Sequence, residues 1–312
     1  MANILVLQVD NRDLDYLGLT KKLSKFMCKT MTENEDEFKG FTYNYLYMDM
    51  NNYTKKKMNP CTTKIHVMND ILHTARLVST TTITTTTITT TTTTSSKMTT
   101  TIKTPYNESN TTDEIPAATV EYKTQMVGYP ETKTVVTNNF YDAIVFLDSD
   151  AWIQSFQNLH RLVIKLLNSE NKHGCYSRDP YIKQNTYINS GSFIIKVDDY
   201  VKNMYRVVLE QLEHDESHWD KHPYDQFYLS NFIYEHKDDF MVFKPPIVNT
   251  PLGAVIRHNW WKTHKMFFDL YELLDHFHKN QIPKNYQEID FDKELDDLEF
   301  PNPNEEGYVY RH

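Results

Sequence analysis

The chain of 312 residues is long enough for one large α/β domain or two small ones, and its 39% hydrophobic and 13% aromatic residues can bury a substantial core. A formal net charge of −9 argues against general binding to nucleic acid or to an anionic membrane, because both need a basic surface. The seven glycines form neither a GxGxxG nor a GxxxxGK(S/T) motif, so a glycine-rich phosphate loop is not expected.

The N-terminus and the cysteines bear on the cellular compartment. The apolar run that follows Met1 ends at Asp10, which is too short for a signal peptide or a membrane anchor, and no later stretch approaches membrane length. Cys28, Cys61 and Cys175 lie far apart and form no CxxC pair, as is typical of reduced thiols. We therefore expect a cytoplasmic protein without a membrane segment.

Strands and helices alternate at the beginning of the chain. Residues 4–9 form an almost continuous apolar run, which is typical of a buried parallel strand. Residues 14–30 carry apolar side chains at helical spacing, and residues 41–48 alternate aromatic and other side chains as a strand does. Pro60 then begins an amphipathic helix. This order predicts an α/β fold with a doubly wound, mostly parallel sheet flanked by helices.

A low-complexity insertion interrupts this pattern between about residues 74 and 139. Residues 79–104 are almost pure threonine, and polar sequence continues after them. We predict that the insertion is disordered or loosely extended, because it lacks the apolar residues that build a core. Threonine favours strands, so an extra hairpin is a second possibility, although no neighbouring apolar run would support it.

Regular structure is predicted again from residue 143 onward. We expect strands at 143–147, 188–196 and 240–243, and helices at 156–167, 198–212, 224–234 and 264–278. Residues 279–312 are rich in Asp and Glu and contain prolines, which indicates a solvated acidic tail. Residues 1–278 would then form a single domain interrupted by the insertion.

Two carboxylates at the end of a predicted strand give the strongest chemical signal. The apolar residues 143–147 lead directly into Asp148-Ser149-Asp150. The carboxyl edge of a parallel sheet is where open α/β folds bind ligands, and residues two apart on a strand face the same way. Asp148 and Asp150 can therefore hold one Mg²⁺ or Mn²⁺, which would neutralise a diphosphate. The alternative is a pair of acids that merely precede a turn.

Two further segments offer groups for a polar ligand. Asn189-Ser190-Gly191 precedes an apolar strand: its Asn and Ser can bond a polyol, and its Gly lets the backbone approach closely. Asp225 and Gln226 stand at the predicted start of a helix. An ordinary turn before a strand and an ordinary helix-start acid are the structural alternatives.

A histidine and a lysine follow a later short apolar strand. His258 can complete a metal site of two carboxylates and one imidazole, a mixed set that suits Mn²⁺. Lys262 can meet a departing phosphate. A lone histidine with a purely structural role is the alternative reading.

The order of these motifs resembles retaining GT-A glycosyltransferases. A strand ending in DSD, then NSGSF, then DQ, then a late His and Lys is similar to the galactosyl-, mannosyl- and xylosyltransferase family of Golgi glycan and xyloglucan synthesis. Residues 11–16 look like the segment after that family's first strand, and Lys64 resembles its lysine-bearing helix. The resemblance spans about residues 4–73 and 140–265. The family's membrane anchor and the glycine near its late histidine are absent here.

The resemblance implies a role for each matching residue. Asp148, Asp150 and His258 would bind Mn²⁺ or Mg²⁺, and Gln226 with Asp225 would be catalytic beside the anomeric carbon. Donor-binding residues would be Asp10, Arg12, Lys64, Asp148, Ser149, Asp179, Asn189, Ser190, Gly191 and Lys262.

The expected activity is therefore metal-dependent transfer of a hexosyl or pentosyl group, with retention, to an acceptor hydroxyl. The donor would be a nucleotide sugar, with a UDP-sugar expected first, and the acceptor a glycan or a protein. A haloacid-dehalogenase-like phosphohydrolase with Asp148 as nucleophile is one alternative, although its motif belongs on the first strand and is followed by Gly or Thr. A noncatalytic sugar-binding module is another.

Overall fold

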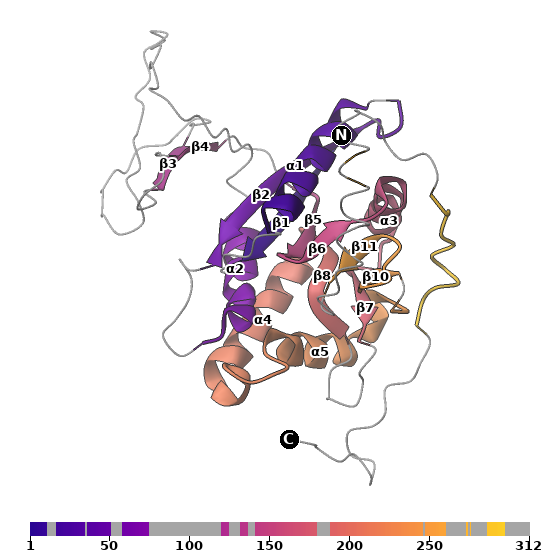
Figure 1. Cartoon of the computed structure of the whole chain (residues 1–312). Helices are drawn as coiled ribbons and strands as arrows, with labels where there is room; N and C mark the ends of the chain where they lie inside the picture. Colours follow the sequence, from indigo (N-terminus) through magenta and orange to yellow (C-terminus); the bar gives the residue numbers. More distant parts are fainter. Residues whose placement is uncertain are drawn as a thin grey trace. The chain divides into compact units, whose positions relative to one another are not determined.

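The computed structural model describes residues 1–10, 17–34, 36–50, 58–74, 120–124, 132–136, 141–179, 188–245, 247–259, 273, 275 and 286–296. The chain divides into two compact units (Figure 1). The first unit joins residues 1–72 to residues 142–312, and the second is formed by residues 73–141.

A six-stranded sheet forms the centre of the first unit within the described residues. The strands lie in the order β2 (Phe41–Asp49), β1 (Ala2–Asp10), β5 (Ala143–Asp148), β8 (Ile188–Lys196), β7 (Gly174–Arg178) and β9 (Phe240–Phe243). All of them run in one direction except β8, which is antiparallel to both of its neighbours. β1 and β5, in the middle of the sheet, are almost wholly buried, which explains their continuous apolar runs.

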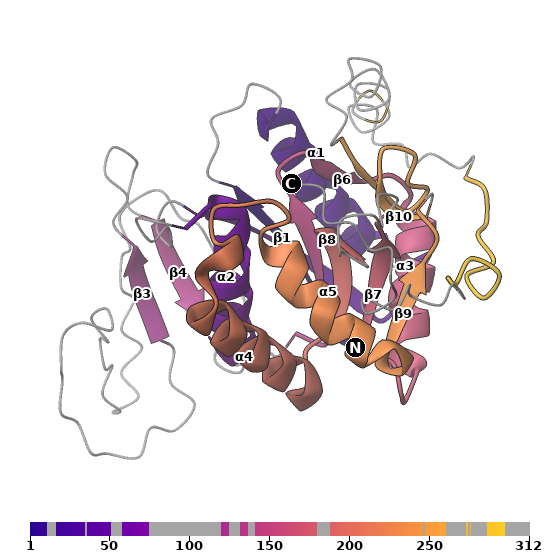
Figure 2. The same cartoon turned by 90° about the horizontal axis from the view of Figure 1, so that it is seen from below.

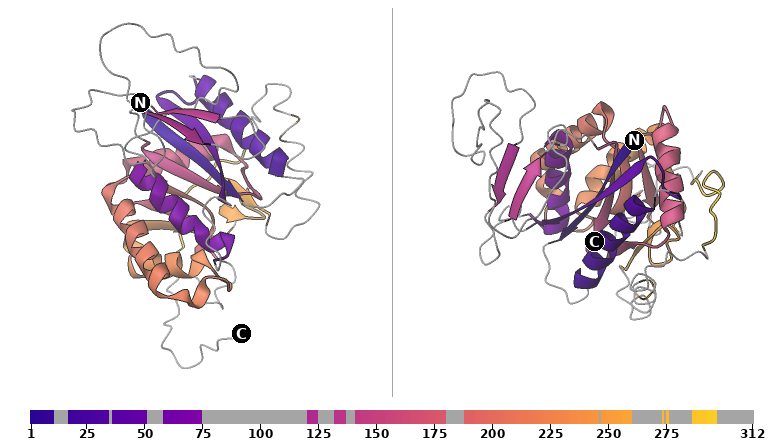
Figure 3. Two further views of the ribbon diagram at one scale, coloured as in Figure 1. Left: turned by 90° about the vertical axis from the view of Figure 1, so that its left-hand side faces the viewer. Right: turned by 90° about the horizontal axis from the view of Figure 1, so that it is seen from above.

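Helices cover both faces of this sheet. Figures 2 and 3 show α1 (Leu17–Glu33) and α3 (Phe156–Asn168) on one face, and α2 (Pro60–Thr74), α4 (Asp199–His214) and α5 (Asp225–Glu235) on the other. Two short 3₁₀ turns, η3 (Glu216–His218) and η4 (Lys237–Asp239), flank α5. Among the helices described, none combines the length and the apolar character that crossing a membrane requires.

A small second sheet lies beside the end of β5. In the described residues it contains β10 (Val248–Thr250), β11 (Ile256–His258) and β6 (Ala151–Ile153), in that order. Because β6 follows Asp150 directly and β11 ends at His258, this sheet joins two distant parts of the sequence.

The predicted α/β fold with helices on both faces is confirmed, and its predicted strands and helices match observed ones to within a few residues. The predicted helix at 264–278 lies almost entirely outside the described residues, as does the threonine run at 79–104. Within the second unit, β3 (Val120–Thr124) pairs with β4 (Thr132–Val136) as an antiparallel hairpin. The Val, Thr and Tyr residues of these strands have the strand propensity that fits this pairing.

Part of the expected acidic tail packs against the rest of the first unit, to which it belongs. Ile289 and Phe291 are buried, and Phe291 lies edge-on to Phe243 of β9. The amide of Asn158 on α3 donates to the Gln287 carbonyl at 2.8 Å. Residues 286–296 thus cover α3 and β9 instead of lying wholly in solvent, because two apolar side chains stand among the acidic ones.

Candidate active site

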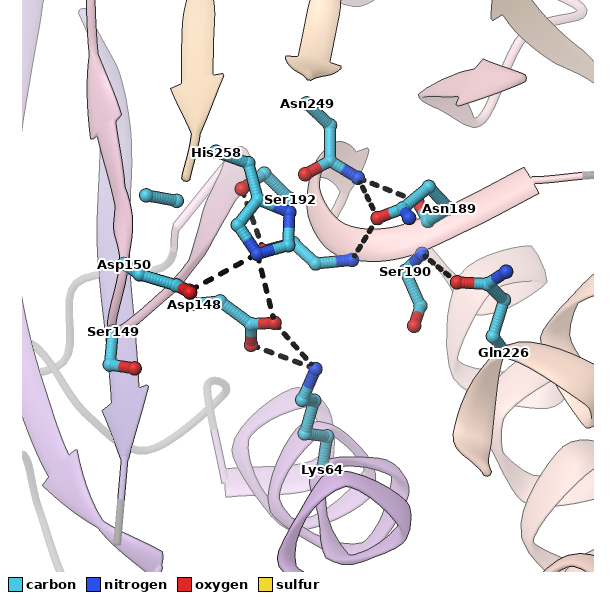
Figure 4. A network of polar contacts seen from close by, with 12 residues as sticks. Lys64, Asp148, Ser149, Asp150, Asn189, Ser190, Ser192, Gln226, Asn249 and His258 are labelled. Atoms are coloured by element: carbon cyan, nitrogen blue, oxygen red, sulfur yellow. Dashed lines mark hydrogen bonds and ion pairs between the residues drawn. The ribbon is translucent and has the colours of Figure 1, made fainter. Parts of the chain in front are cut away.

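The sheet topology gathers polar side chains at one edge. Asp148 ends β5 and Asp179 follows β7. Because β8 runs in the opposite direction, its first residues, which include Asn189 and Gly191, begin at the edge where β5 and β7 end. Figure 4 shows that Lys64, from the first turns of α2, points toward this edge.

Asp148, Asp150 and His258 form a candidate metal centre. Each offers one ligand atom, and these atoms lie within 4.8 Å of one another. His258 Nε2 is 3.1 Å from Asp150 Oδ1 and 3.8 Å from Asp148 Oδ2. Two neighbouring ligands of one octahedral cation lie about 3 Å apart, so the first distance fits and the second needs only a small movement.

The backbone explains why these three residues meet. The strand ends at Asp148, and Asp150 lies in the turn that follows, so the carboxylates converge through a turn and not through the strand alternation that the sequence suggested. His258 is opposite Ala151 in the antiparallel β11–β6 pair, and the Asn259 amide donates to the Asp150 carbonyl at 2.9 Å. This pairing holds the imidazole beside the turn.

Gly191 leaves the space that the cluster occupies. A Cβ at this position would lie 2.2 Å from His258 Cε1 and 3.1 Å from Asp148 Oδ2. Any side chain would therefore push the histidine away from the two carboxylates. The position therefore requires glycine. The cluster itself, two buried or nearly buried carboxylates and an imidazole, fits a divalent cation such as Mn²⁺.

Lys64 is the cation closest to this group among the contacts described. Its ammonium lies 2.8 Å from each carboxylate oxygen of Asp148. Burial alone would lower the pKa of Lys64, but the negative charges of Asp148 and Asp225 raise the pKa above its usual value. The lysine is thus a permanent positive charge at the end of β5.

A second set of polar side chains lies next to the metal cluster. Gln226 Nε2 donates to Asp179 Oδ2 at 2.7 Å, and its Oε1 accepts from the Ser190 amide at 3.4 Å. Asn189 Nδ2 also donates to Asp179 Oδ2, at 3.3 Å, and its Oδ1 accepts from the Gly191 amide at 3.0 Å. The structure therefore brings together Gln226, which the sequence analysis assigned to catalysis, and Asp179 and Asn189, which it assigned to donor binding.

Asp225 and Ser149 are buried in the same region. Burial raises the pKa of Asp225 to about 6, and the nearby positive charge of Lys64 limits the rise. The carbonyl of Ser149 accepts from the Thr20 hydroxyl at 2.8 Å and lies 3.5 Å from Gln8 Nε2. These contacts hold the backbone of Ser149 in the turn that follows β5.

Two residues of this region were missed by the sequence analysis. Asn249, at φ 65°, is fully buried, and its Nδ2 donates to the carbonyl and the side-chain oxygen of Asn189 at 2.9 and 2.5 Å. Gln8 lies inside β1 and bonds the turn that follows β5. A polar residue inside the apolar run at 4–9 was the available signal for Gln8, whereas Asn249 offered none.

For three of the residues assigned to donor binding, the structure does not describe the side chain. Arg12 and Lys262 lie outside the described residues, and so does the side chain of Asp10, whose backbone ends β1.

Comparison with known proteins gives only distant structural likeness. No protein-family model and no curated protein matches the sequence. The structure is similar to a glycosyltransferase involved in the glycosylation of the major capsid of PBCV-1, with a TM-score of 0.44 and 13% identity over 88% of this chain and 98% of the other. It is also similar to the glycosyltransferase GlyE of Streptococcus pneumoniae TIGR4, with a TM-score of 0.42 and 10% identity over 92% of this chain and 66% of the other. Likeness at this level assigns no activity, so function rests on the residues of the site.

Proposed function

We propose that this chain is a metal-dependent glycosyltransferase that moves a sugar from a nucleotide sugar to an acceptor hydroxyl with retention. The observation that carries the proposal is the convergence of Asp148, Asp150 and His258 at the carboxyl edge of the sheet, with ligand atoms within 4.8 Å of one another. These three residues would hold a Mn²⁺ or Mg²⁺, whose positive charge would offset the charge of the leaving diphosphate.

Lys64 supports a binding site for an anion at this position. Its ammonium lies 2.8 Å from the carboxylate of Asp148 and is buried, so it adds positive charge where water is scarce. A phosphate oxygen that approaches the metal cluster would meet this charge, and the family resemblance assigns a contact with the diphosphate to Lys262 as well. Asp10, Arg12 and the Ser149 region complete the proposed donor site.

The hydrogen-bonded set beside the cluster supports a sugar subsite. Asp179, Asn189 and Gln226 are held by one another, so their orientations are fixed before a ligand binds. Hydroxyl groups of the donor sugar would replace or extend these bonds. The amide oxygen of Gln226 would then face the carbon that gains positive charge, with the buried Asp225 behind it.

The reaction that fits this site needs no dedicated protein base. The acceptor oxygen forms its bond to the anomeric carbon on the face from which the diphosphate departs. The bond between that carbon and the phosphate oxygen breaks, and the departing phosphate oxygen takes the hydroxyl proton. The products are a glycoside of unchanged anomeric configuration and a nucleoside diphosphate.

The phosphohydrolase alternative is disfavoured by the position of Asp148. In that class of phosphohydrolase the nucleophilic Asp ends the first strand and its motif is followed by Gly or Thr, whereas Asp148 ends β5 and the DSD motif is followed by Ala151. The two activities also differ in their products, since a phosphohydrolase releases inorganic phosphate.

A thermal-shift panel tests the proposal, because a ligand that binds the folded state raises its melting temperature. The full chain is heated with UDP- and GDP-sugars, each in Mn²⁺ and in EDTA. We expect at least one donor, a UDP-sugar first among them, to raise Tm only in Mn²⁺, and to do so in wild type but not in Asp150→Asn. Equal shifts in EDTA, or no shift with any donor, would refute the proposal.

A further inference from the structure

We propose that Gln8 is a positioning residue for the metal centre: its buried amide ties the backbone of the 148–151 turn, and so sets the separation of the Asp148 and Asp150 carboxylates. This inference rests on the proposed function, because it concerns the cation site defined there.

One side-chain amide serves three carbonyls of the turn. Gln8 Nε2 lies 3.1 Å from the carbonyl oxygen of Asp148, 3.3 Å from that of Ala151 and 3.5 Å from that of Ser149. Gln8 itself has no exposed surface. An amide nitrogen has two hydrogens, so the three carbonyl oxygens share them. Three parts of the turn therefore face a single donor group.

Two neighbouring side chains complete the arrangement. The Tyr45 hydroxyl on β2 donates to Gln8 Oε1 at 2.9 Å, which keeps the nitrogen directed at the turn. The Thr20 hydroxyl on α1 donates to the Ser149 carbonyl at 2.8 Å. The turn is therefore held from β1, β2 and α1, none of which supplies a ligand atom to the cluster.

The choice of glutamine at this position is hard to explain by folding alone. Residues 4–7 and Val9 on the same strand are apolar and buried, so a leucine would suit the surrounding core. A buried amide is tolerated only when its bonds are made, and here they are made to the turn between the two carboxylates. Without them the turn carbonyls lose a buried donor, and the turn is free to relax.

The experiment measures Mn²⁺ binding to the full chain by calorimetry, at a temperature where every variant is folded. The variants are Gln8→Leu, Tyr45→Phe and Thr20→Val, with Val6→Ala as a control that weakens the same strand without touching the turn. Removing an outer partner of a metal site typically costs roughly 10–100-fold in affinity. We expect Gln8→Leu to weaken Mn²⁺ binding within that range, and Tyr45→Phe and Thr20→Val to weaken it less.

The control separates positioning from stability. Val6→Ala should lower Tm yet keep the wild-type affinity for Mn²⁺, whereas Gln8→Leu should lose affinity whatever its Tm. If Gln8→Leu binds Mn²⁺ as wild type does, or if Val6→Ala loses as much affinity, the positioning role is wrong while the metal site stands. If the wild-type chain binds no Mn²⁺, the proposed function and this inference fall together.

Discussion

His258 Nε2 lies 3.1 Å from Oδ1 of Asp150, although 108 residues separate the two in sequence. The antiparallel pairing of β11 with β6 produces this contact, since it places His258 opposite Ala151. A buried imidazole between two carboxylates is a ligand set for a divalent cation, and several predictions depend on it.

Replacing His258 by alanine removes one of the three ligand atoms. We expect His258→Ala to weaken Mn²⁺-dependent binding of the nucleoside diphosphate by at least roughly 10-fold, and to lower turnover as well. The measurement is calorimetric titration with UDP in Mn²⁺. His214→Ala, which removes an exposed histidine on α4, is the matched control and should bind as wild type does. Unchanged affinity in His258→Ala would exclude the histidine from the metal centre.

Gln226 is predicted to act on the reaction more than on binding. Its amide orients Asp179 and borders the sugar subsite, but it is not among the metal-cluster residues. Gln226→Ala should therefore lower kcat by roughly 10–10³-fold with little change in the affinity for the nucleotide. Steady-state kinetics and UDP titration measure the two quantities separately. Gln211→Ala, on the exposed side of α4, controls for the substitution, and a wild-type kcat in Gln226→Ala would remove this residue from the active site.

Much of this site was predictable because its signals are local. An apolar strand that ends in Asp148 and Asp150 can be recognised in the sequence, and so can a polar segment at the start of another strand. The sheet edge and its metal candidates follow from such patterns. His258 was a candidate ligand by its residue type and its place after a short apolar strand, but no local pattern places it beside a turn 108 residues away.

Long-range polar contacts were the part that the sequence could not supply. Gln8 reaches a turn 140 residues away, and Asn249 reaches Asn189 across 60 residues. No repeating pattern in the sequence indicates either contact, because each depends on how the strands of the folded chain are placed. The burial of Ile289 and Phe291 was not predictable either, because two apolar residues in an acidic stretch are too few to indicate packing.

The lowered pKa of His160 predicts that the folded state loses stability in mild acid. Burial lowers the pKa of His160 to about 4 from an ordinary value of 6.5, and its Nδ1 lies 2.7 Å from the Tyr43 hydroxyl. The unfolded chain then binds more protons than the folded chain between these values, so this contribution to stability is lost as pH falls from about 6.5 toward 4.

Melting temperatures at pH 7 and pH 5 test this relation. Wild type should lose more of its Tm over this interval than His160→Gln, which keeps a hydrogen-bonding side chain but does not titrate. Asp225, with its pKa raised to about 6, opposes the trend, because its effect favours the folded state at lower pH. Both proteins share Asp225, so the difference between them isolates His160. Equal losses would show that the histidine does not govern the acid response.

The packed segment 286–296 predicts a stability cost that an acidic tail would not have. Phe291 is buried against Phe243, so Phe291→Ala should lower the free energy of unfolding by about 3 kcal/mol. Asp290→Ala, at an exposed neighbour, should change it far less. Denaturant unfolding of both variants gives the comparison, and a loss near zero for Phe291→Ala would mean that the segment is not part of the folded core.

The most direct test of the proposed activity is the release of nucleoside diphosphate from a panel of UDP- and GDP-sugars. The full chain is incubated with each donor in Mn²⁺ or in excess EDTA, beside Asp150→Asn as the variant that loses a carboxylate ligand. We predict that at least one donor yields its nucleoside diphosphate in Mn²⁺, and that EDTA or the Asp150→Asn substitution abolishes the release. Release at the same rate in EDTA or by Asp150→Asn, or release of inorganic phosphate in place of the nucleoside diphosphate, would contradict a metal-dependent glycosyltransferase.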